Sequence, residues 1–134
     1  MEDIFVARLM STSLHTATTD TLVEDAAQLM LDNNISSVVV VDEDNQLDGI
    51  LTTTDFVRIV AKSHPKAQTT VQKYMTTDVV TANAQDSIID VAEQMTEHGF
   101  HHMPVVDDDE GVIGIVTTSD LAAYLSRVDQ PPVA

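Results

Sequence analysis

The first half of the chain alternates apolar and polar stretches in an order that predicts helices and strands. Apolar residues recur at helical spacing from Leu22 to Met30, and we expect this helix to be capped by Asp20 or Thr21. Four consecutive valines within Ser36–Asp42 predict a strand that is buried on both faces. The other expected elements are a short helix at 3–10 with Ile4, Phe5 and Leu9 in the core, an extended piece at Leu14–Ala17, a polar turn at Asp42–Gln46, a strand at Leu47–Leu51 and a helix at about Thr54–Ser63.

The second half repeats this order of elements. Its expected elements are a helix from Val71, an extended piece at Val79–Ala82, a helix from Ser87 to about His98, a strand at His102–Val106, a turn at Asp107–Gly111, a strand at Val112–Val116 and a helix at Ser119–Arg127. A polar segment joins the halves, and Pro65 within it ends the preceding helix. We therefore expect one domain at 4–61, a linker at 62–70, a second domain at 71–128 and a flexible tail at 129–134.

The two halves are copies of one unit. At a fixed offset of 65 residues, Val6–Val60 aligns without a gap with Val71–Leu125, and 17 of the 55 pairs are identical. The best preserved stretch reads GILTTTD at Gly49–Asp55 and GIVTTSD at Gly114–Asp120. Matches at one offset indicate a duplicated supersecondary unit. Because a half of this size has a small core, we expect the halves to pack on each other.

Each preserved stretch predicts a strand that turns directly into a helix. Asp55 and Asp120 then fall in the first helical turn, beside backbone N–H groups that no helical carbonyl accepts. Thr52 with Asp55, and Thr117 with Asp120, have the spacing of a capping box, although Glu or Gln is its usual partner. The pattern is consistent with a structural cap and with a ligand site.

Composition narrows the choice of partners and compartment. The chain has 134 residues, and its 22 acidic residues against 6 basic ones give a net charge of −16. Such a surface repels nucleic acid and anionic membranes, so we expect neither as a partner. Dispersed acidity with little lysine indicates a halophilic origin. Cysteine is absent, which excludes disulfides, and with neither an apolar run of membrane-spanning length nor a basic leader we expect a cytoplasmic protein.

The repeated motifs resemble those of a tandem pair of CBS domains, named after cystathionine beta-synthase and paired as a Bateman module. The resemblance covers about residues 4–128 and rests on Met10 with Thr12, Met75 with Thr77, the strand Met103–Asp107 with its counterpart Val38–Asp42, and the signatures Gly49–Asp55 and Gly114–Asp120. It implies an α/β (α+β) fold of two repeated β-α-β-β-α units packed with pseudo-two-fold symmetry. It also implies a stand-alone module that is not an enzyme.

The same resemblance implies adenosine-containing ligands, namely AMP, ADP, ATP or S-adenosylmethionine, held in two clefts between the units as regulatory ligands and not as a required cofactor. A carboxylate can accept from both ribose hydroxyls, and a helix N-terminus can donate to phosphate. One cleft would combine Thr52, Thr54 and Asp55 with Val80, Thr81, His101, His102, Met103 and Pro104. The other would combine Thr117, Ser119 and Asp120 with His15, Thr16, Ser36, Ser37 and Val38.

The two implied clefts differ in their charge. His101 and His102 stand where several family members carry a basic pair that contacts phosphate, whereas the other cleft has Ser36 and Ser37 there. We therefore expect a phosphorylated ligand in the cleft of Asp55, with a hydrogen-bonded structural histidine as the alternative role for either ring. We expect neither a metal site nor a catalytic site, because the histidines lack a fourth ligand and the acidic turns lack the glycine and glutamate of a calcium loop.

Two functions remain open. The first is a non-catalytic regulatory module that senses an adenosine ligand and works as a homodimer. The alternative is a structural or interaction protein with degenerate, empty clefts, which docks onto a partner enzyme or transporter. Ligand-dependent melting separates the two, because a ligand at one hundred times its Kd adds about 2.7 kcal/mol to the stability.

Overall fold

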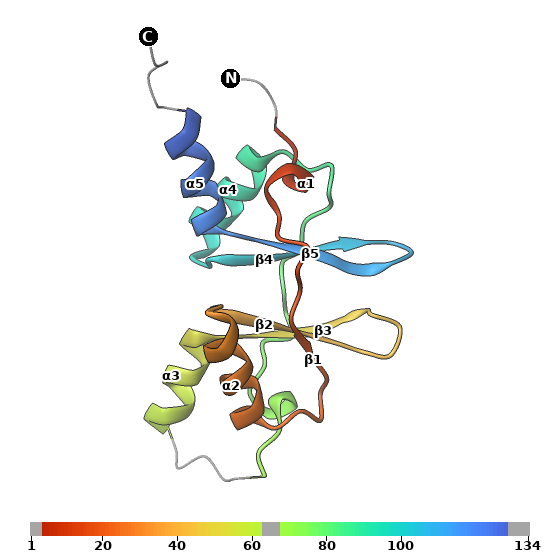
Figure 1. Cartoon of the computed structure of the whole chain (residues 1–134), viewed down its shortest axis with the longest axis vertical. Coiled ribbons are helices and arrows are strands. Elements are labelled where there is room, and N and C mark those ends of the chain that lie inside the picture. Colours follow the sequence, from red (N-terminus) through yellow and green to blue (C-terminus); the bar gives the residue numbers. More distant parts are fainter. Residues whose placement is uncertain (1–3, 63–67, 129–134) are drawn as a thin grey trace. The chain divides into compact units, whose positions relative to one another are not determined.

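The computed structural model describes residues 4–62 and 68–128, and it has a mixed α+β fold (Figure 1). Residues 63–67, which include the predicted helix terminator Pro65, and the predicted tail at 129–134 lie outside the described residues. The elements are α1 (Val6–Leu9), β1 (Thr16–Ala17), α2 (Val23–Asn33), β2 (Ser37–Val41), β3 (Leu47–Thr52), α3 (Thr53–Lys62), the 3-10 helix η1 (Val71–Lys73), α4 (Ile88–His98), β4 (His102–Asp107), β5 (Gly111–Thr117) and α5 (Thr118–Val128).

The chain forms two compact units. The first-repeat unit is built mainly on Leu14–Val79. The second-repeat unit is built mainly on Val80–Asp108 and the segment from Ile113 onward, and it also includes the described part of Met1–Ser13. The N-terminal segment is thus part of the unit formed by the second repeat.

The first-repeat unit is a three-stranded sheet with two helices on one side (Figure 1). Strand β1 runs parallel to β2, and β2 runs antiparallel to β3, with Ser37 opposite Thr52 and Val39 opposite Ile50. All five residues of β2 are buried, as the run of valines predicts. The core residues of this unit are Ala17, Ala26, Met30, Val38, Val40, Leu51 and Val71.

The second-repeat unit pairs β4 with β5, and α4 and α5 lie on one side of them (Figure 1). Ala82 makes an isolated parallel bridge to Val105, in the place that β1 takes beside β2. The core residues of this unit are Ile4, Val6, Ala82, Ile88, Val91, Met95, Met103, Val105 and Val116.

The segment that leads into each repeat pairs with the other repeat. In the second-repeat unit, Ser11 N–H donates to the Ile115 carbonyl at 2.8 Å, and the Ile115 N–H donates back at 3.0 Å. In the first-repeat unit, Thr76 and Ile50 exchange the same pair of bonds, at 2.9 and 3.0 Å. The two sets of partners differ by the sequence offset of 65, so the duplication includes this exchange.

The glycine of each repeated signature lies where this exchange brings other atoms close to the strand. A Cβ on Gly49 would lie 2.7 Å from the Thr76 carbonyl oxygen, and a Cβ on Gly114 would lie 3.0 Å from the Ser11 carbonyl oxygen. Real Cβ atoms essentially never come closer than 3.0 Å to another heavy atom, so Gly49 has no room for one against the Thr76 backbone. At Gly114 the backbone contact would be tight, and the Met10 side chain, whose sulfur lies 2.7 Å from the Cβ position, would have to move.

Three details of the predicted elements are wrong. Phe5 is 52% exposed because the backbone there is still extended, so side chains alternate and Ile4 and Val6 take the buried positions. Helix α2 has no side-chain cap, since its N-cap residue is Leu22, and the Thr21 hydroxyl accepts instead from the Thr18 N–H at 3.0 Å. The predicted helix at Val71 is one 3-10 turn. The predicted extended piece at Val79–Ala82 makes the Ala82 bridge.

Candidate functional site

Each repeat has a junction where a strand turns directly into a helix. β3 ends at Thr52 and α3 begins at Thr53, and β5 ends at Thr117 where α5 begins at Thr118. The first helical N–H in each case is bound by the residue that precedes the neighbouring strand. Thr53 N–H donates to the Ser36 carbonyl, and Thr118 N–H donates to the His101 carbonyl, both at 3.0 Å. Each junction therefore lies beside the start of β2 or β4.

The predicted capping box is present at both junctions. The Asp55 Oδ2 atom accepts from the Thr52 N–H at 2.8 Å and from the Thr52 hydroxyl at 3.2 Å. The Asp120 Oδ2 atom accepts from the Thr117 N–H at 2.8 Å and from its hydroxyl at 3.1 Å. In return each aspartate N–H faces the threonine Oγ1, at 3.4 and 3.3 Å. One carboxylate oxygen of each aspartate thus stabilises the helix start.

The two aspartates differ at the other carboxylate oxygen. Asp55 is only 5% exposed, and its Oδ1 lies 3.6 Å from Nη1 of Arg58. Position 123 corresponds to Arg58 in the second repeat and is an alanine. Asp120 is partly exposed, and among the described residues it forms no ion pair. Its Oδ1 is therefore the more available acceptor.

Arg58 is a site residue that the sequence analysis missed. The signal that could have revealed it is its spacing of three residues from Asp55, since side chains at i and i+3 are neighbours on a helix. Its side chain is 65% exposed, so solvent screens the ion pair strongly.

The two histidines precede and begin β4, at the junction of Asp120. His101 is exposed and His102 is half-buried. Burial lowers the pKa of His102 below 6.5, and the neighbouring charge of His101 lowers this pKa further. His102 is therefore harder to protonate than a histidine in water, which weakens its use as a cationic phosphate ligand near neutral pH.

The predicted ligand-binding residues fall into two groups, one in each unit. The first-repeat unit holds His15, Thr16, Ser36, Ser37, Val38, Thr52, Thr54 and Asp55. The second-repeat unit holds Val80, Thr81, His101, His102, Met103, Pro104, Thr117, Ser119 and Asp120. Asp55 thus lies in the same unit as the strand residues predicted for the cleft of Asp120. Asp120 lies in the same unit as the strand residues, including the histidines, predicted for the cleft of Asp55. The pairing of Asp55 with the two histidines stays a prediction.

Several of these residues can offer only backbone atoms to a ligand. The side chains of Val38, Met103 and Pro104 are buried in the cores of their units. The Pro104 carbonyl already accepts from the Ala82 N–H at 2.9 Å. Exposed polar side chains at the junctions include those of Thr54 and Ser119.

Neither a metal centre nor a membrane span is found in the part of the chain that the structure describes. Within 4–62 and 68–128, no group of three or more His, Asp or Glu side chains is arranged to hold a metal ion. Over the same residues, no helix is long and apolar enough to cross a bilayer.

Comparison with known proteins places this geometry in a family. The model of the CBS domain family matches residues 6–62 and 71–127. The crystal structure of the CBS domain pair of protein MJ0100, in complex with 5′-methylthioadenosine and S-adenosyl-L-methionine, is 29% identical with a TM-score of 0.87. That alignment covers 96% of this chain and 100% of the other.

Curated relatives include short proteins and long enzymes. The CBS domain-containing protein YhcV of Bacillus subtilis is 32% identical over 113 residues, which is 84% of this chain and 79% of YhcV. The homoserine O-acetyltransferase of Methanosalsum zhilinae is 32% identical over 121 residues, which is 90% of this chain. The chain spans only 24% of that enzyme.

Proposed function

This chain belongs to the CBS domain family, and from that premise we propose that it is a regulatory module that binds an adenosine-containing ligand without chemistry of its own. The observation that carries the proposal is the pair of aspartate junctions. In each, Oδ2 is bound within the capping box and Oδ1 is not. A second carboxylate oxygen beside a helix N-terminus suits the hydroxyls of a ribose, since charged hydrogen bonds are the strong ones.

The ligand class rests on the relative of known structure. That CBS pair, 29% identical to this chain, was solved with S-adenosyl-L-methionine and 5′-methylthioadenosine, which share an adenosine moiety. AMP, ADP and ATP share it too and are included in the proposal. A regulatory effect further requires that the ligand bind two arrangements of the protein with different affinity.

Of the two junctions, we expect the one at Asp120 to bind the ribose more tightly. Arg58 competes for the Asp55 carboxylate, whereas Asp120 is partly exposed and lacks this arginine. The family resemblance favours the cleft of Asp55 for a phosphorylated ligand, because it implies that Asp55 shares a cleft with the histidines. The hydrogen bond from the Thr118 N–H to the His101 carbonyl brings the histidines to the junction of Asp120. This position instead supports a phosphate near Asp120.

The alternative function, an interaction protein with empty clefts, is favoured by one observation. Both aspartates already complete a capping box, so helix capping alone can explain the repeated signature. Such a protein would act by docking onto an enzyme or transporter.

Calorimetry with a panel of AMP, ADP, ATP, S-adenosylmethionine and 5′-methylthioadenosine tests the proposal. Asp120→Asn keeps an oxygen that can accept from Thr117 but removes the charge, so we expect roughly 10- to 100-fold weaker binding from a loss of about 1.5–3 kcal/mol. Asp55→Asn should weaken binding less. Ser87→Ala is the control, because Ser87 caps α4 outside both junctions and its Oγ accepts from the Ile89 N–H at 3.2 Å.

The control should lose about 0.5–2 kcal/mol of stability and keep its affinity. If the wild-type protein binds no member of the panel in calorimetry or in melting experiments, the regulatory proposal fails and the alternative stands. Binding that both Asp→Asn variants leave unchanged would show that the ribose is not held at the junctions.

A further inference from the structure

The ion pair of Arg58 gives the two aspartate junctions different local charges. Nη1 of Arg58 lies 3.6 Å from Oδ1 of Asp55, the carboxylate oxygen that the capping box leaves unused. The second repeat has Ala123 at the position of Arg58. Over the two signatures and the helical turns that follow them, 49–58 and 114–123, the sequence has no other Lys or Arg. Arg58 therefore compensates the charge of Asp55, whereas no such residue compensates Asp120.

A local cation matters to a ligand of this protein because the net charge is −16. Such a surface repels an anion, and a phosphate monoester carries a charge of about −1.5 to −2 at pH 7. The planar fork of an arginine matches two phosphate oxygens at once. The Arg58 side chain is 65% exposed, so its guanidinium can turn from Asp55 to a ligand without disturbing the core.

A 5′-phosphorylated adenosine can replace both partners of this ion pair at once. Its ribose hydroxyls can donate to Oδ1 of Asp55 in place of Arg58, and its phosphate can accept from Arg58 in place of Asp55. The sugar ring separates the 5′ phosphate from the 2′ and 3′ hydroxyls, so the two groups suit two side chains that are neighbours on one helix. An uncharged adenosine compound also displaces Arg58, but it offers the guanidinium no new anion.

We propose, on the basis of the proposed function, that Arg58 makes the Asp55 junction selective for adenosine ligands that carry a 5′ phosphate, such as AMP. Arg58 opposes the binding of a ribose alone and favours a ribose that brings its own anion. The Asp120 junction lacks this selecting residue, because Ala123 takes its place. The two repeats thus offer two junctions of different ligand preference.

Calorimetry on variants with one junction disabled tests each junction separately. Asp120→Asn reports on the Asp55 junction, and Asp55→Asn reports on the Asp120 junction. The ligands are AMP and 5′-methylthioadenosine, which share the adenosine and differ at the 5′ position by a phosphate and a methylthio group. The readout is the ratio of their Kd values at pH 8 in 0.5 M KCl. Because burial holds the pKa of His102 below 6.5, this histidine is neutral at pH 8.

The Asp120→Asn background should show the effect of Arg58. We expect Arg58→Ala to weaken AMP binding roughly tenfold and to leave 5′-methylthioadenosine unchanged or slightly tighter. Arg58→Lys keeps the charge without the fork and should keep part of the preference for AMP. Lys62→Ala is the matched control, because it removes the same charge from an exposed position four residues further along α3. It should leave the ratio unchanged.

The Asp55→Asn background tests whether the preference can be transferred. Ala123 is exposed on α5, so Ala123→Arg places a guanidinium three residues after Asp120 without displacing the core. We expect this variant to bind AMP roughly tenfold more tightly and to gain nothing for 5′-methylthioadenosine. In 2 M KCl the effects of Arg58→Ala and Ala123→Arg should both become smaller, because salt screens exposed charges.

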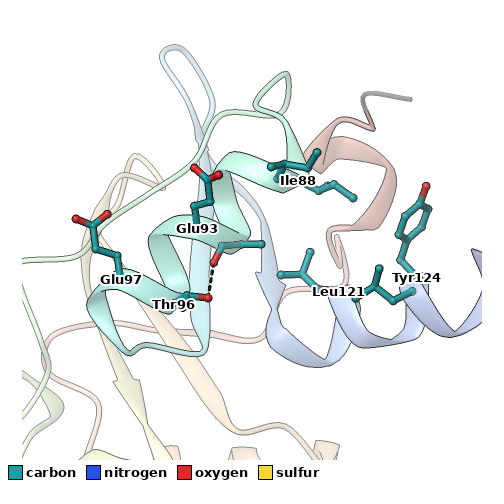
Figure 2. Close-up of a pocket in the computed structure, with 9 residues that line it drawn as sticks. Ile88, Glu93, Thr96, Glu97, Leu121 and Tyr124 are labelled. Atoms are coloured by element: carbon teal, nitrogen blue, oxygen red, sulfur yellow. Dashed lines mark hydrogen bonds between the residues drawn. The ribbon is translucent and has the colours of Figure 1, made fainter. Parts of the chain in front are cut away.

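An apolar groove between α4 and α5 requires one further control (Figure 2). Its volume is about 470 Å³, and it is lined by Ile88, Leu121 and Tyr124, with Glu93 also beside it. 5′-Methylthioadenosine suits such a surface better than AMP does, because it is uncharged and more apolar. The double variant Asp55→Asn/Asp120→Asn measures binding outside the junctions, which is then subtracted for each ligand.

The outcomes separate this proposal from the regulatory function on which it rests. An unchanged ratio in Arg58→Ala would show that the ion pair serves only the helix, and it would overturn the selectivity while the regulatory function stands. The same holds if the wild type binds an adenosine ligand and Asp120→Asn binds neither. A wild type that binds no adenosine ligand overturns the regulatory function and the selectivity together. Circular dichroism checks that each variant is folded, as the exposure of Arg58 and Ala123 predicts.

Discussion

At the scale of single residues, Gly49 and Gly114 have the clearest structural requirement. Each lies where the leading segment of one repeat pairs against a strand of the other repeat. The atoms that a Cβ would meet differ between the two sites. At Gly49 they are the Thr76 carbonyl oxygen at 2.7 Å and the Met75 sulfur at 2.9 Å, whereas at Gly114 the nearest is the Met10 sulfur at 2.7 Å.

We predict that Gly49→Ala destabilises the protein by about 1–3 kcal/mol, the usual range for overpacking. Gly114→Ala should cost less, because the flexible Met10 side chain can move more easily than the Thr76 backbone. Urea denaturation monitored by circular dichroism measures both. Equal stability of Gly49→Ala and wild type would contradict the close pairing at β3.

His102 should make stability depend on pH. Its pKa in the folded protein lies below the 6.5 of the unfolded chain, mainly because of burial. As the pH falls below about 6.5, the unfolded chain takes up a proton that the folded protein resists, so stability should decrease. His102 alone can change the free energy of unfolding by at most about 1.4 kcal/mol per pH unit.

Urea denaturation between pH 7.5 and 5 checks this sign, with His102→Asn as the control that cannot titrate. The wild type should lose more stability than the variant over this range. A variant with the same or a steeper acid dependence would show that His102 is not the group responsible.

At the scale of elements, the leading segments tie each repeat to the other. Val6 is fully buried in the second-repeat unit, and its N–H donates to the Asp86 carbonyl at 2.8 Å. Val71 is its counterpart in the first-repeat unit, where its N–H donates to the Thr21 carbonyl at 2.8 Å. Neither segment belongs to the core of the repeat that follows it directly in the sequence.

We predict that Val6→Ala and Val71→Ala each cost about 1–3 kcal/mol, from lost burial and a small cavity. Hydrogen exchange should locate the loss in opposite units. Val6→Ala should deprotect α4, β4 and β5 first, and Val71→Ala should deprotect α2, β2 and β3 first. Faster exchange in α2 and β2 for Val6→Ala would contradict the exchange of leading segments.

At the scale of the whole molecule, the main unfavourable contribution to stability is repulsion between acidic groups. A net charge of −16 on 134 residues means that acidic groups repel one another over most of the surface. Basic residues are too few to offset this repulsion: the chain has 6 of them against 22 acidic residues. Dissolved cations must therefore do most of the screening.

We predict that KCl raises the melting temperature between 0.1 and 2 M, because the Debye length falls from about 10 Å to below about 3 Å. A gain of about 1 kcal/mol corresponds to a rise of roughly 2–8 °C. Differential scanning calorimetry measures it. Glu43→Lys/Asp108→Lys, which adds four charges and so changes −16 to −12, should gain less from salt. A melting temperature that stays level or falls would contradict the screening account.

The sequence by itself determined the features that depend on neighbours along the chain. The buried valine strand, the helical spacing of α2 and α4, the duplication and the capping boxes of Asp55 and Asp120 were all predictable. The duplication is read directly from identical residues at an offset of 65. The other features depend on side-chain periodicity or on bonds between residues at most four apart, which are the same in almost any fold.

Only the tertiary structure decided the features that depend on distant pairing. Phe5 is exposed, and the extended piece at Val79–Ala82 pairs through Ala82 with Val105, because the pairing of the leading segments and of Ala82 is set by contacts tens of residues away. The same contacts explain why Gly49 has no room for a Cβ and why Gly114 has little. The tertiary structure also places the histidines beside Asp120, which lies 18 or 19 positions away in the sequence. The backbone hydrogen bond between His101 and Thr118 holds them there, and no local sequence pattern encodes it.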